Sequence, residues 1–139
     1  MLDVEVVRPP RTAGAPRADE IQELCRWVAG RFAVRAGHVA VEFVDAARIA
    51  ELNARHRGRE GPTDVLSFPI DGPPVTGTPQ SGRTAAPREL GDVVICPEHT
   101  VDLREAVVHG MLHLLGMDHE RDAGEMLALQ DELLARRRQ

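Results

Sequence analysis

The sequence predicts an α+β fold, with a single domain over residues 1–139 in which one mixed sheet of about four strands carries helices packed on it. Its 139 residues are 42% hydrophobic and 28% charged, which suits one globular domain with its own core. Strand-like and helix-like stretches alternate in the first half, whereas helical stretches cluster in the second half. This order of stretches is typical of one mixed sheet covered by helices.

The first half of the chain is predicted to form two units of one strand and one helix. Leu2, Val4 and Val6 alternate with acidic residues, which is the period of a half-buried strand. After a proline-broken loop, apolar residues at spacings of three and four indicate an amphipathic helix. Asp45 is a good N-cap for the second helix, and Gly58 is a typical stop. The predicted strands cover residues 2–6 and 39–43, and the predicted helices cover residues 18–32 and 46–56.

The second half is predicted to hold two further strands and two helices. Thr100 or Asp102 can cap the first of these helices, and Gly116 can end it. Residues 71–88 are rich in Pro, Gly, Thr and Ser without an apolar period, so we expect a loop there. The strands are predicted over residues 63–69 and 91–96, and the last helix over residues 123–137.

Three of the six histidines fall in residues 108–120, which read V-H-G-M-L-H-L-L-G-M-D-H-E. His109 and His113 are four residues apart, so on a helix they lie on the same face. Gly116 is placed to end that helix, and a turn after it can fold His119 back toward the first two imidazoles. Three neutral nitrogen ligands with an open fourth position are typical of a catalytic zinc site.

A lone pair of histidines at this spacing could equally be a surface pair or two satisfied core side chains. Three of them, on a helix otherwise made largely of Val, Met and Leu, would be costly to bury unless they coordinated something. The sequence therefore predicts one Zn²⁺ per chain on a helix in the C-terminal half, although imidazoles also accept nickel and other metals. For Cys96, a small buried hydrophobic residue is favoured over a fourth ligand.

Gly110 decides which zinc chemistry is available. Zinc peptidases with this ligand spacing carry Glu directly after the first histidine, where it acts as the general base. Glycine inside a helix costs about 1 kcal/mol relative to alanine, so this position needs a reason. Close approach of a substrate and tight helix packing both explain a glycine, and the sequence does not choose between them. In either case the base of a peptidase is absent.

Charge and cysteine content limit the partners and the compartment. The net charge of −5 argues mildly against nucleic acid, yet all 17 cations are arginines, the better residue for bidentate phosphate contacts. Four of them form either a local basic patch or a solvated helix face: Arg48, Arg55, Arg57 and Arg59. No segment approaches the roughly 18 apolar residues of a membrane span, and the two distant cysteines suit reduced thiols. A cytoplasmic protein without a membrane partner is expected.

Residues 109–119 follow the pattern His-Gly-x-Leu-His-Leu-x-Gly-x-Asp-His, which is the signature of the YbeY family. The sequence resembles this family of bacterial single-domain zinc endoribonucleases. Further stretches match in the family's order and extend the resemblance to roughly residues 39–129: Leu52-Asn53, His56-Arg57-Gly58, Thr63 to Pro69, and Leu90 to Ile95. The resemblance implies that His109, His113 and His119 are the metal ligands.

The resemblance also implies an activity and its partners. It implies single-strand-specific RNA cleavage in rRNA maturation, at the 3′ end of 16S rRNA, and in ribosome quality control. RNA and ribosomal particles would be the partners and DNA would not, whereas the oligomeric state stays open. Arg57 matches the family's functional arginine, and we expect it to stabilise charge on the phosphodiester. An exposed arginine at a helix end is the alternative.

The sequence does not decide the general base, the effect of a short segment before the metal helix, or the choice between alternative functions. The general base is unidentified, and the candidates are Asp64, Asp92 and Asp118. Each could instead cap a strand end or, in the case of Asp118, hold an imidazole. Family members usually carry a longer helical segment before the His-Gly helix, whereas only twelve residues separate Cys96 from His109 here. A metal-dependent peptidase and a non-catalytic ribosome assembly factor with structural zinc remain as alternative functions.

Overall fold

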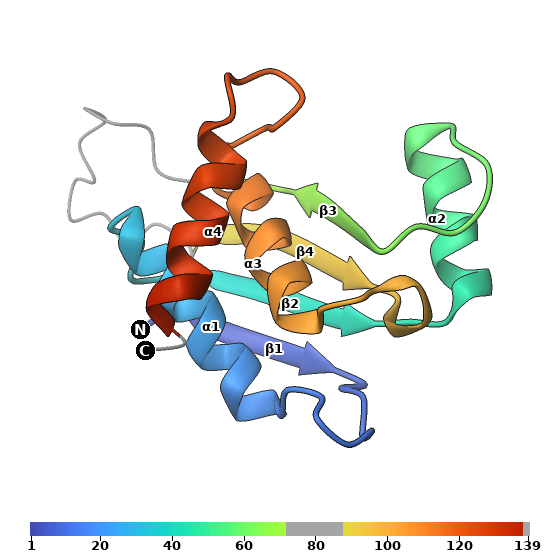
Figure 1. The fold of residues 1–139 in the computed structure, drawn as a ribbon, viewed down its shortest axis with the longest axis horizontal. Coiled ribbons are helices and arrows are strands. Elements are labelled where there is room, and N and C mark those ends of the chain that lie inside the picture. Colours follow the sequence, from blue (N-terminus) through green and yellow to red (C-terminus); the bar gives the residue numbers. More distant parts are fainter. Residues whose placement is uncertain (72–87, 138–139) are drawn as a thin grey trace.

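The computed structural model describes residues 1–71 and 88–137, and its elements follow the predicted order (Figure 1). Most of the predicted loop over residues 71–88 lies outside the described residues. The elements are β1 Asp3–Val7, α1 Ala18–Arg31, β2 His38–Phe43, α2 Ala46–Arg57, β3 Val65–Pro69, β4 Glu89–Ile95, the short 3-10 helix η1 Pro97–His99, α3 Leu103–Leu114 and α4 Glu125–Arg137.

The four strands form one mixed sheet in the order β1-β2-β4-β3. β1 pairs with β2 and β2 with β4 in parallel, whereas β3 runs antiparallel to β4 at the edge of the sheet. This confirms the predicted α+β fold with a mixed sheet of four strands. The edge position of β3 is important for the site, because the strand has a sheet neighbour on one side only.

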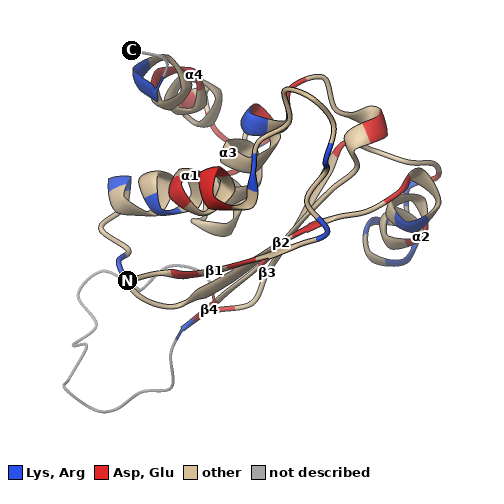
Figure 2. Cartoon of the chain, turned by 90° about the horizontal axis from the view of Figure 1, so that it is seen from below, with Lys and Arg blue, Asp and Glu red and all other residues tan. Residues whose placement is uncertain are grey.

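Helices cover the two faces of the sheet unequally. α1, α3 and α4 form a layer on one face, and α2 lies apart from them at the far end of the sheet (Figure 2). The main core fills the space under the three-helix layer. A smaller cluster packs α2 against the other face through Ile49 and Leu52, which meet Leu66 of β3 and Val94 of β4.

The predicted helix caps are largely present. The Asp45 carboxylate accepts the backbone N–H of Arg48 at 2.8 Å, and Gly58 ends α2 with a φ of 65°. Of the two candidate caps for α3, Asp102 is correct, because its carboxylate accepts the N–H groups of Arg104 and Glu105. The Thr100 hydroxyl instead donates to the Cys96 carbonyl at 2.7 Å.

Two glycines allow α3 to lie close to the sheet. A Cβ on Gly110 would stand 2.4 Å from Val93 Cγ1 of β4, so a side chain there would push the helix off the sheet. Of the two explanations for Gly110, the structure therefore supports tight helix packing. Gly91 has a φ of 137°, and a Cβ there would meet the Phe68 carbonyl oxygen at 2.2 Å and Leu114 Cδ2 at 3.1 Å.

The boundaries differ from prediction mainly at loop junctions. β4 begins at Glu89 rather than Gly91, because pairing with β2 and β3 extends it beyond its apolar run. α4 begins at Glu125 rather than Ala123, since the preceding residues form a turn closed by Asp122. Both cysteines are buried and free, as expected. Within the described residues, no helix is long and apolar enough to cross a membrane.

Candidate metal centre and its pocket

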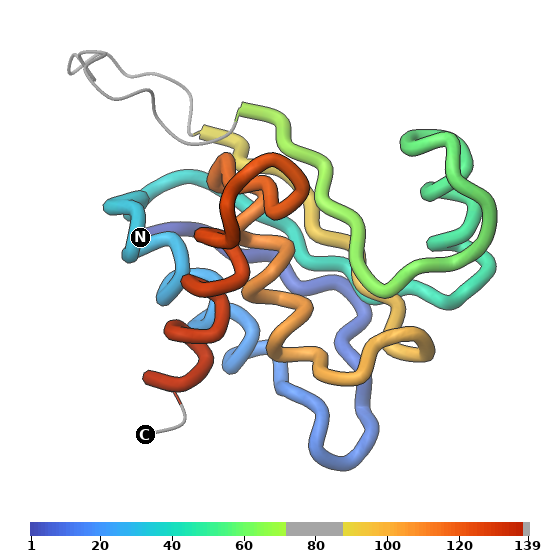
Figure 3. The backbone as a smooth tube through the Cα atoms, turned by 45° about the horizontal axis from the view of Figure 1, so that its top comes forward, coloured from blue at the N-terminus to red at the C-terminus, as the bar shows by residue number. Residues whose placement is uncertain are grey.

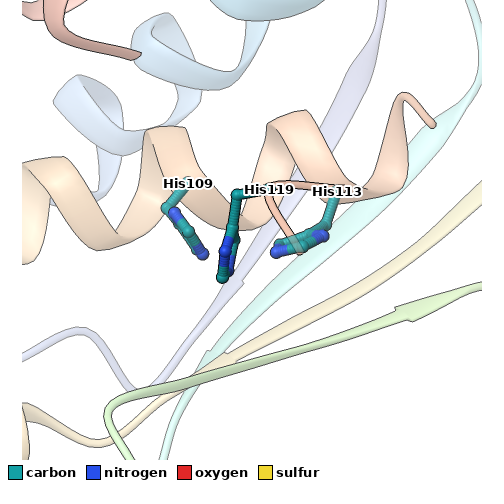
Figure 4. Close-up of side chains that lie close together, drawn as sticks. All are labelled: His109, His113 and His119. Carbon is teal, nitrogen blue, oxygen red and sulfur yellow. The ribbon is translucent and has the colours of Figure 1, made fainter. Parts of the chain in front are cut away.

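α3 and the loop after it bring the three predicted histidines together. His109 and His113 project from the same side of α3, and His119 returns from the loop to lie beside them (Figure 4). Gly116, at a φ of 97°, turns the chain out of the helix as predicted. The possible ligand atoms of the three imidazoles all lie within 4.8 Å of one another. Within the described ranges, these three side chains form the one group able to hold a metal ion.

Carboxylates within the loop stabilise the turn that carries His119. The Asp118 carboxylate accepts the backbone N–H of Glu120 at 3.0 Å. The Asp122 carboxylate accepts the backbone N–H groups of Gly124 and Met126, both at 2.9 Å. After this turn α4 runs back alongside α3 (Figures 1 and 3). The position of His119 therefore depends on the short hydrogen bonds on its C-terminal side.

The surroundings of His113 favour its neutral imidazole. Burial lowers the pKa of His113 below its usual value, and the neighbouring His109 and His119 lower it further. A neutral imidazole keeps the lone pair that a metal ion needs, whereas an imidazolium has none to give. The site thus favours His113 in the form that binds metals.

Gln130 of α4 supports the cluster, and the sequence analysis missed it. His109 Nδ1 lies 2.8 Å from Gln130 Oε1, so the ring nitrogen donates to the amide oxygen. Gln130 is only 5% exposed. The sequence does contain a signal for it, because Gln130 is the one polar member of the buried α4 face made by Met126, Leu133 and Leu134. Asp118, the earlier candidate for holding an imidazole, bonds backbone instead.

The donor set fits a zinc ion. Zinc takes imidazole nitrogens at about 2.0–2.1 Å in tetrahedral geometry, so two nitrogens on one ion lie roughly 3.3–3.4 Å apart. The observed separations, within 4.8 Å, allow contact after small side-chain rotations. Nδ1 of His109 is occupied by Gln130, which leaves Nε2 of that ring as its free donor. Cys96 does not join the cluster, since it is fully buried in the small α2 cluster.

The histidines open onto a pocket of about 1080 Å³. One wall, here called the arginine wall, consists of Arg57, Arg59, Thr63, Asp64, Val65, Ser67 and Pro69 from the end of α2 through β3. A second part of the lining, here called the acidic wall, consists of residues 116–123 with Glu125. The Ser67 hydroxyl donates to the Gly110 carbonyl at 3.2 Å and ties β3 to the helix that carries the ligands.

The arginines of the predicted basic patch differ in their partners. Arg48 and Arg55 both lie near Glu51, with N···O distances of 2.9 and 3.7 Å. Arg57 and Arg59 line the pocket and form no ion pair within the part of the chain that the structure describes. The predicted patch therefore divides into a solvated helix face and two arginines that are free to meet an anion.

The sequence model of the family described as Endoribonuclease YbeY matches residues 16–138. The chain belongs to the YbeY family. Among curated relatives, the Endoribonuclease YbeY of Micrococcus luteus is 42% identical, over 84% of this chain and 82% of that protein. That of Parvibaculum lavamentivorans is 38% identical, over 96% of this chain and 80% of its own length. The resemblance seen in the sequence is thereby confirmed.

A solved structure agrees with the YbeY-family fold. The solution structure of TM1509 from Thermotoga maritima superposes with a TM-score of 0.54 at 25% identity, over 96% of this chain and 87% of that one. In the present family member, the short segment between Cys96 and His109 forms η1 and the first turns of α3. His109 therefore lies inside a regular helix.

The three candidate bases lie in different places. Asp64 and Asp118 line the pocket. Asp64 also caps the start of β3, since its Oδ1 accepts the Val65 N–H at 2.8 Å. Asp92 does not line the pocket: its neighbour Val93 faces α3, so Asp92 points to the opposite face. Burial raises the pKa of Asp92, and Glu89 and Glu42 raise it further. The candidates for the base are reduced to Asp64 and Asp118.

Proposed function

We propose that this protein is a zinc-dependent endoribonuclease that cleaves single-stranded RNA. It would act in rRNA maturation, at the 3′ end of 16S rRNA, and in ribosome quality control. RNA and ribosomal particles are its proposed partners, and the cytoplasm is its proposed location. Family membership supports the reaction. The observation that carries the proposal is a three-imidazole cluster inside an open pocket with arginines on one wall.

His109, His113 and His119 are the proposed ligands of one zinc ion per chain. When bound, zinc acts as a Lewis acid toward the phosphodiester. The three imidazoles are neutral donors, so nothing in the ligand set repels an approaching phosphate. A pocket with a cation at its floor and arginines along one wall suits a polyanion, even in a chain with a net charge of −5.

Arg57 is proposed as the group that stabilises charge on the phosphodiester. Arg57 lines the pocket and its guanidinium has no carboxylate partner among the described residues, so its N–H groups can donate to non-bridging oxygens. Charge grows on those oxygens as the bond to the leaving oxygen breaks. Asp64 and Asp118 are the remaining candidates for accepting a proton, because both carboxylates face the same space.

The size of the pocket supports a chain-like substrate. Its volume of about 1080 Å³ lies just above the range of roughly 300–1,000 Å³ that is typical of small-molecule sites. More than one nucleotide can therefore occupy it at once. The opening between two walls admits an extended single strand, which agrees with cleavage within a chain.

The two alternative functions meet specific objections. A metal-dependent peptidase needs a base beside the first histidine, and Gly110 has no side chain and packs on Val93. A structural zinc needs a closed set of four protein ligands, whereas the described residues offer three that open onto a pocket. The endoribonuclease therefore explains more of the site than either alternative.

Parallel cleavage assays test the proposal. Zinc-loaded wild type and His113→Ala would be incubated with one sequence as single-stranded RNA, duplex RNA and single-stranded DNA, and with an unstructured peptide. We expect the wild type to cleave the single-stranded RNA only, and the variant to cleave nothing. Zinc-dependent cleavage of the peptide would favour the peptidase. Full zinc occupancy without cleavage of any substrate, ribosomal particles included, would favour the assembly factor.

A further inference from the structure

Gln130 is an exception on an otherwise apolar helix face. On α4 the buried positions are Met126, Gln130, Leu133 and Leu134, at the spacing of one helical stripe. Asn53 and Gln130 are the two buried polar side chains among the described residues. Burying an amide without a partner costs about 1–3 kcal/mol in proteins, so leucine or methionine would be the simpler choice. A polar residue here needs a purpose other than packing.

The partner of Gln130 is the first histidine of the cluster. Gln130 Oε1 lies 2.8 Å from His109 Nδ1, within the range of a good N–H···O hydrogen bond. The amide oxygen can only accept, so Nδ1 must carry the proton. In a neutral imidazole that assignment leaves Nε2 without hydrogen and with its lone pair free. The contact thus selects one of the two tautomers of His109.

The selected tautomer is the one that the cluster needs. The ring of His109 stands 4.8 Å from that of His113 and 5.2 Å from that of His119, measured between ring centroids. All three imidazoles gather on the same side of α3 (Figure 4). With Nδ1 turned to α4, Nε2 is the nitrogen left for the other two rings and for an ion between them.

We infer that Gln130 is a positioning residue that fixes the tautomer and the ring orientation of His109, so that α4 is part of the metal centre. The inference rests on the proposed metal site. Partners of this kind orient metal-binding histidines, and their loss commonly costs about 10–100-fold in metal affinity. α4 would then act on the site through one hydrogen bond, without touching ion or substrate.

Gln130→Met is the variant that removes the hydrogen bond and keeps the packing. Methionine is unbranched, apolar and similar in length, so it can fill the same space beside Met126. Gln130→Glu retains an oxygen that can accept from Nδ1. Leu133→Ala is the matched control, because it weakens the packing of the same helix face and leaves the hydrogen bond in place. Circular dichroism and thermal unfolding would show that each variant folds.

Two measurements separate the hydrogen bond from the metal. The first is the tautomer of His109 in metal-free protein, read from the ¹⁵N shifts of its ring nitrogens at a pH where the imidazole is neutral. We expect the Nδ1–H form in wild type and in Leu133→Ala, and a shift toward Nε2–H in Gln130→Met. The second is zinc affinity by competition with a chromophoric chelator, together with the visible spectrum of the cobalt-substituted protein.

For zinc, we expect Gln130→Met to bind about 10–100-fold more weakly and to change the cobalt spectrum, with Gln130→Glu and Leu133→Ala close to wild type. Wild-type affinity and spectrum in Gln130→Met would overturn the inference, and so would equal losses in Gln130→Met and Leu133→Ala. A wild type that holds the Nδ1–H tautomer but binds no divalent metal would instead overturn the proposed function, and the hydrogen-bond role would stand.

Discussion

The arginine wall and the acidic wall line one pocket, and their charged groups have different partners. On the arginine wall, Arg57 and Arg59 form no ion pair among residues 1–71 and 88–137. On the acidic wall, Arg121 Nε lies 3.4 Å from the Asp118 carboxylate, so its charge is partly compensated. This difference shows that the net charge of −5 describes the whole chain and not the local charge of the pocket surface that a substrate meets.

Asp118, Asp122 and Glu125 of the acidic wall accept backbone N–H groups of the wall and of the start of α4. Asp122 accepts two backbone N–H groups at the start of α4, and Glu125 Oε2 accepts the Ala123 N–H at 2.7 Å. Negative groups at a helix N-terminus are stabilising through the helix dipole. We therefore interpret this wall as the support of His119, and the arginine wall as the surface for phosphate. The two roles predict different effects for substitutions in the two walls.

The largest loss of zinc and of activity is expected at the three histidines. His113→Ala removes one of the three ligands of the cluster and leaves both walls intact. We expect zinc to fall from one per chain to near none, and RNA cleavage to be lost with it, because two imidazoles hold zinc far more weakly than three. Elemental analysis of the purified variant measures this. Undiminished zinc in His113→Ala would show that the cluster is not the metal site.

Arg57 is the next test, because it compares an arginine from each wall. Removing one preorganised charge stabiliser commonly costs about 10²–10³ in rate, or roughly 3–4 kcal/mol, and we expect this of Arg57→Ala with zinc content unchanged. Arg57→Lys should recover only part of the rate, since lysine lacks the planar fork. Single-turnover cleavage of an rRNA fragment measures all three proteins.

Arg121→Ala is the matched control for Arg57→Ala, because it removes the same charge from the acidic wall. Its guanidinium is 88% exposed and already lies near Asp118, so we expect a rate close to wild type. Equal losses from Arg57→Ala and Arg121→Ala would mean that the two walls do not differ in the way proposed here. Equal rates in wild type, Arg57→Ala and Arg57→Lys would remove Arg57 from the site.

A smaller effect is expected at Arg59. It is exposed at the outer part of the arginine wall, where a phosphate next to the scissile one would pass. Arg59→Ala should weaken RNA binding by several-fold with little change in the single-turnover rate, and the salt dependence of binding should fall by about one phosphate contact. Binding titrations at several salt concentrations measure this. A lower rate at saturating RNA would assign Arg59 to the chemistry.

Local patterns predicted the histidine cluster and the ends of α2, but not which arginines are free to meet an anion. The spacing of His109 and His113 places them on the same face of any helix. Asp45 and Gly58 mark the two ends of α2, because capping preferences depend on the local sequence. The position of the Glu51 side chain decides which arginines of α2 have an ion-pair partner. The need for glycine at position 110 follows only from its contact with Val93 of β4. Contacts between distant segments decide these features, so the sequence left them open.

The role of Gln130 and the start of α4 were also not predicted from the sequence. Gln130 interrupts an apolar stripe, which could have been noticed, but its partner His109 lies 21 residues away on another helix. The last helix was predicted to begin at Ala123, and it begins at Glu125 because Asp122 turns the chain first. A propensity for helix cannot reveal which carboxylate closes the preceding turn.

The smallest expected effect is at Asp122, and it asks whether the acidic wall supports His119 or repels RNA. Asp122→Ala removes the acceptor for the Gly124 and Met126 N–H groups. Loss of such a capping carboxylate commonly costs about 1 kcal/mol of unfolding free energy, and we expect zinc affinity to fall several-fold as His119 loosens. Glu120→Ala is the control, since it removes an exposed charge from the same wall. If the wall is a support, Asp122→Ala weakens zinc binding and Glu120→Ala does not. If its charge mainly repels RNA, both variants tighten RNA binding equally and leave zinc unchanged, and chelator competition beside RNA titration distinguishes the two results.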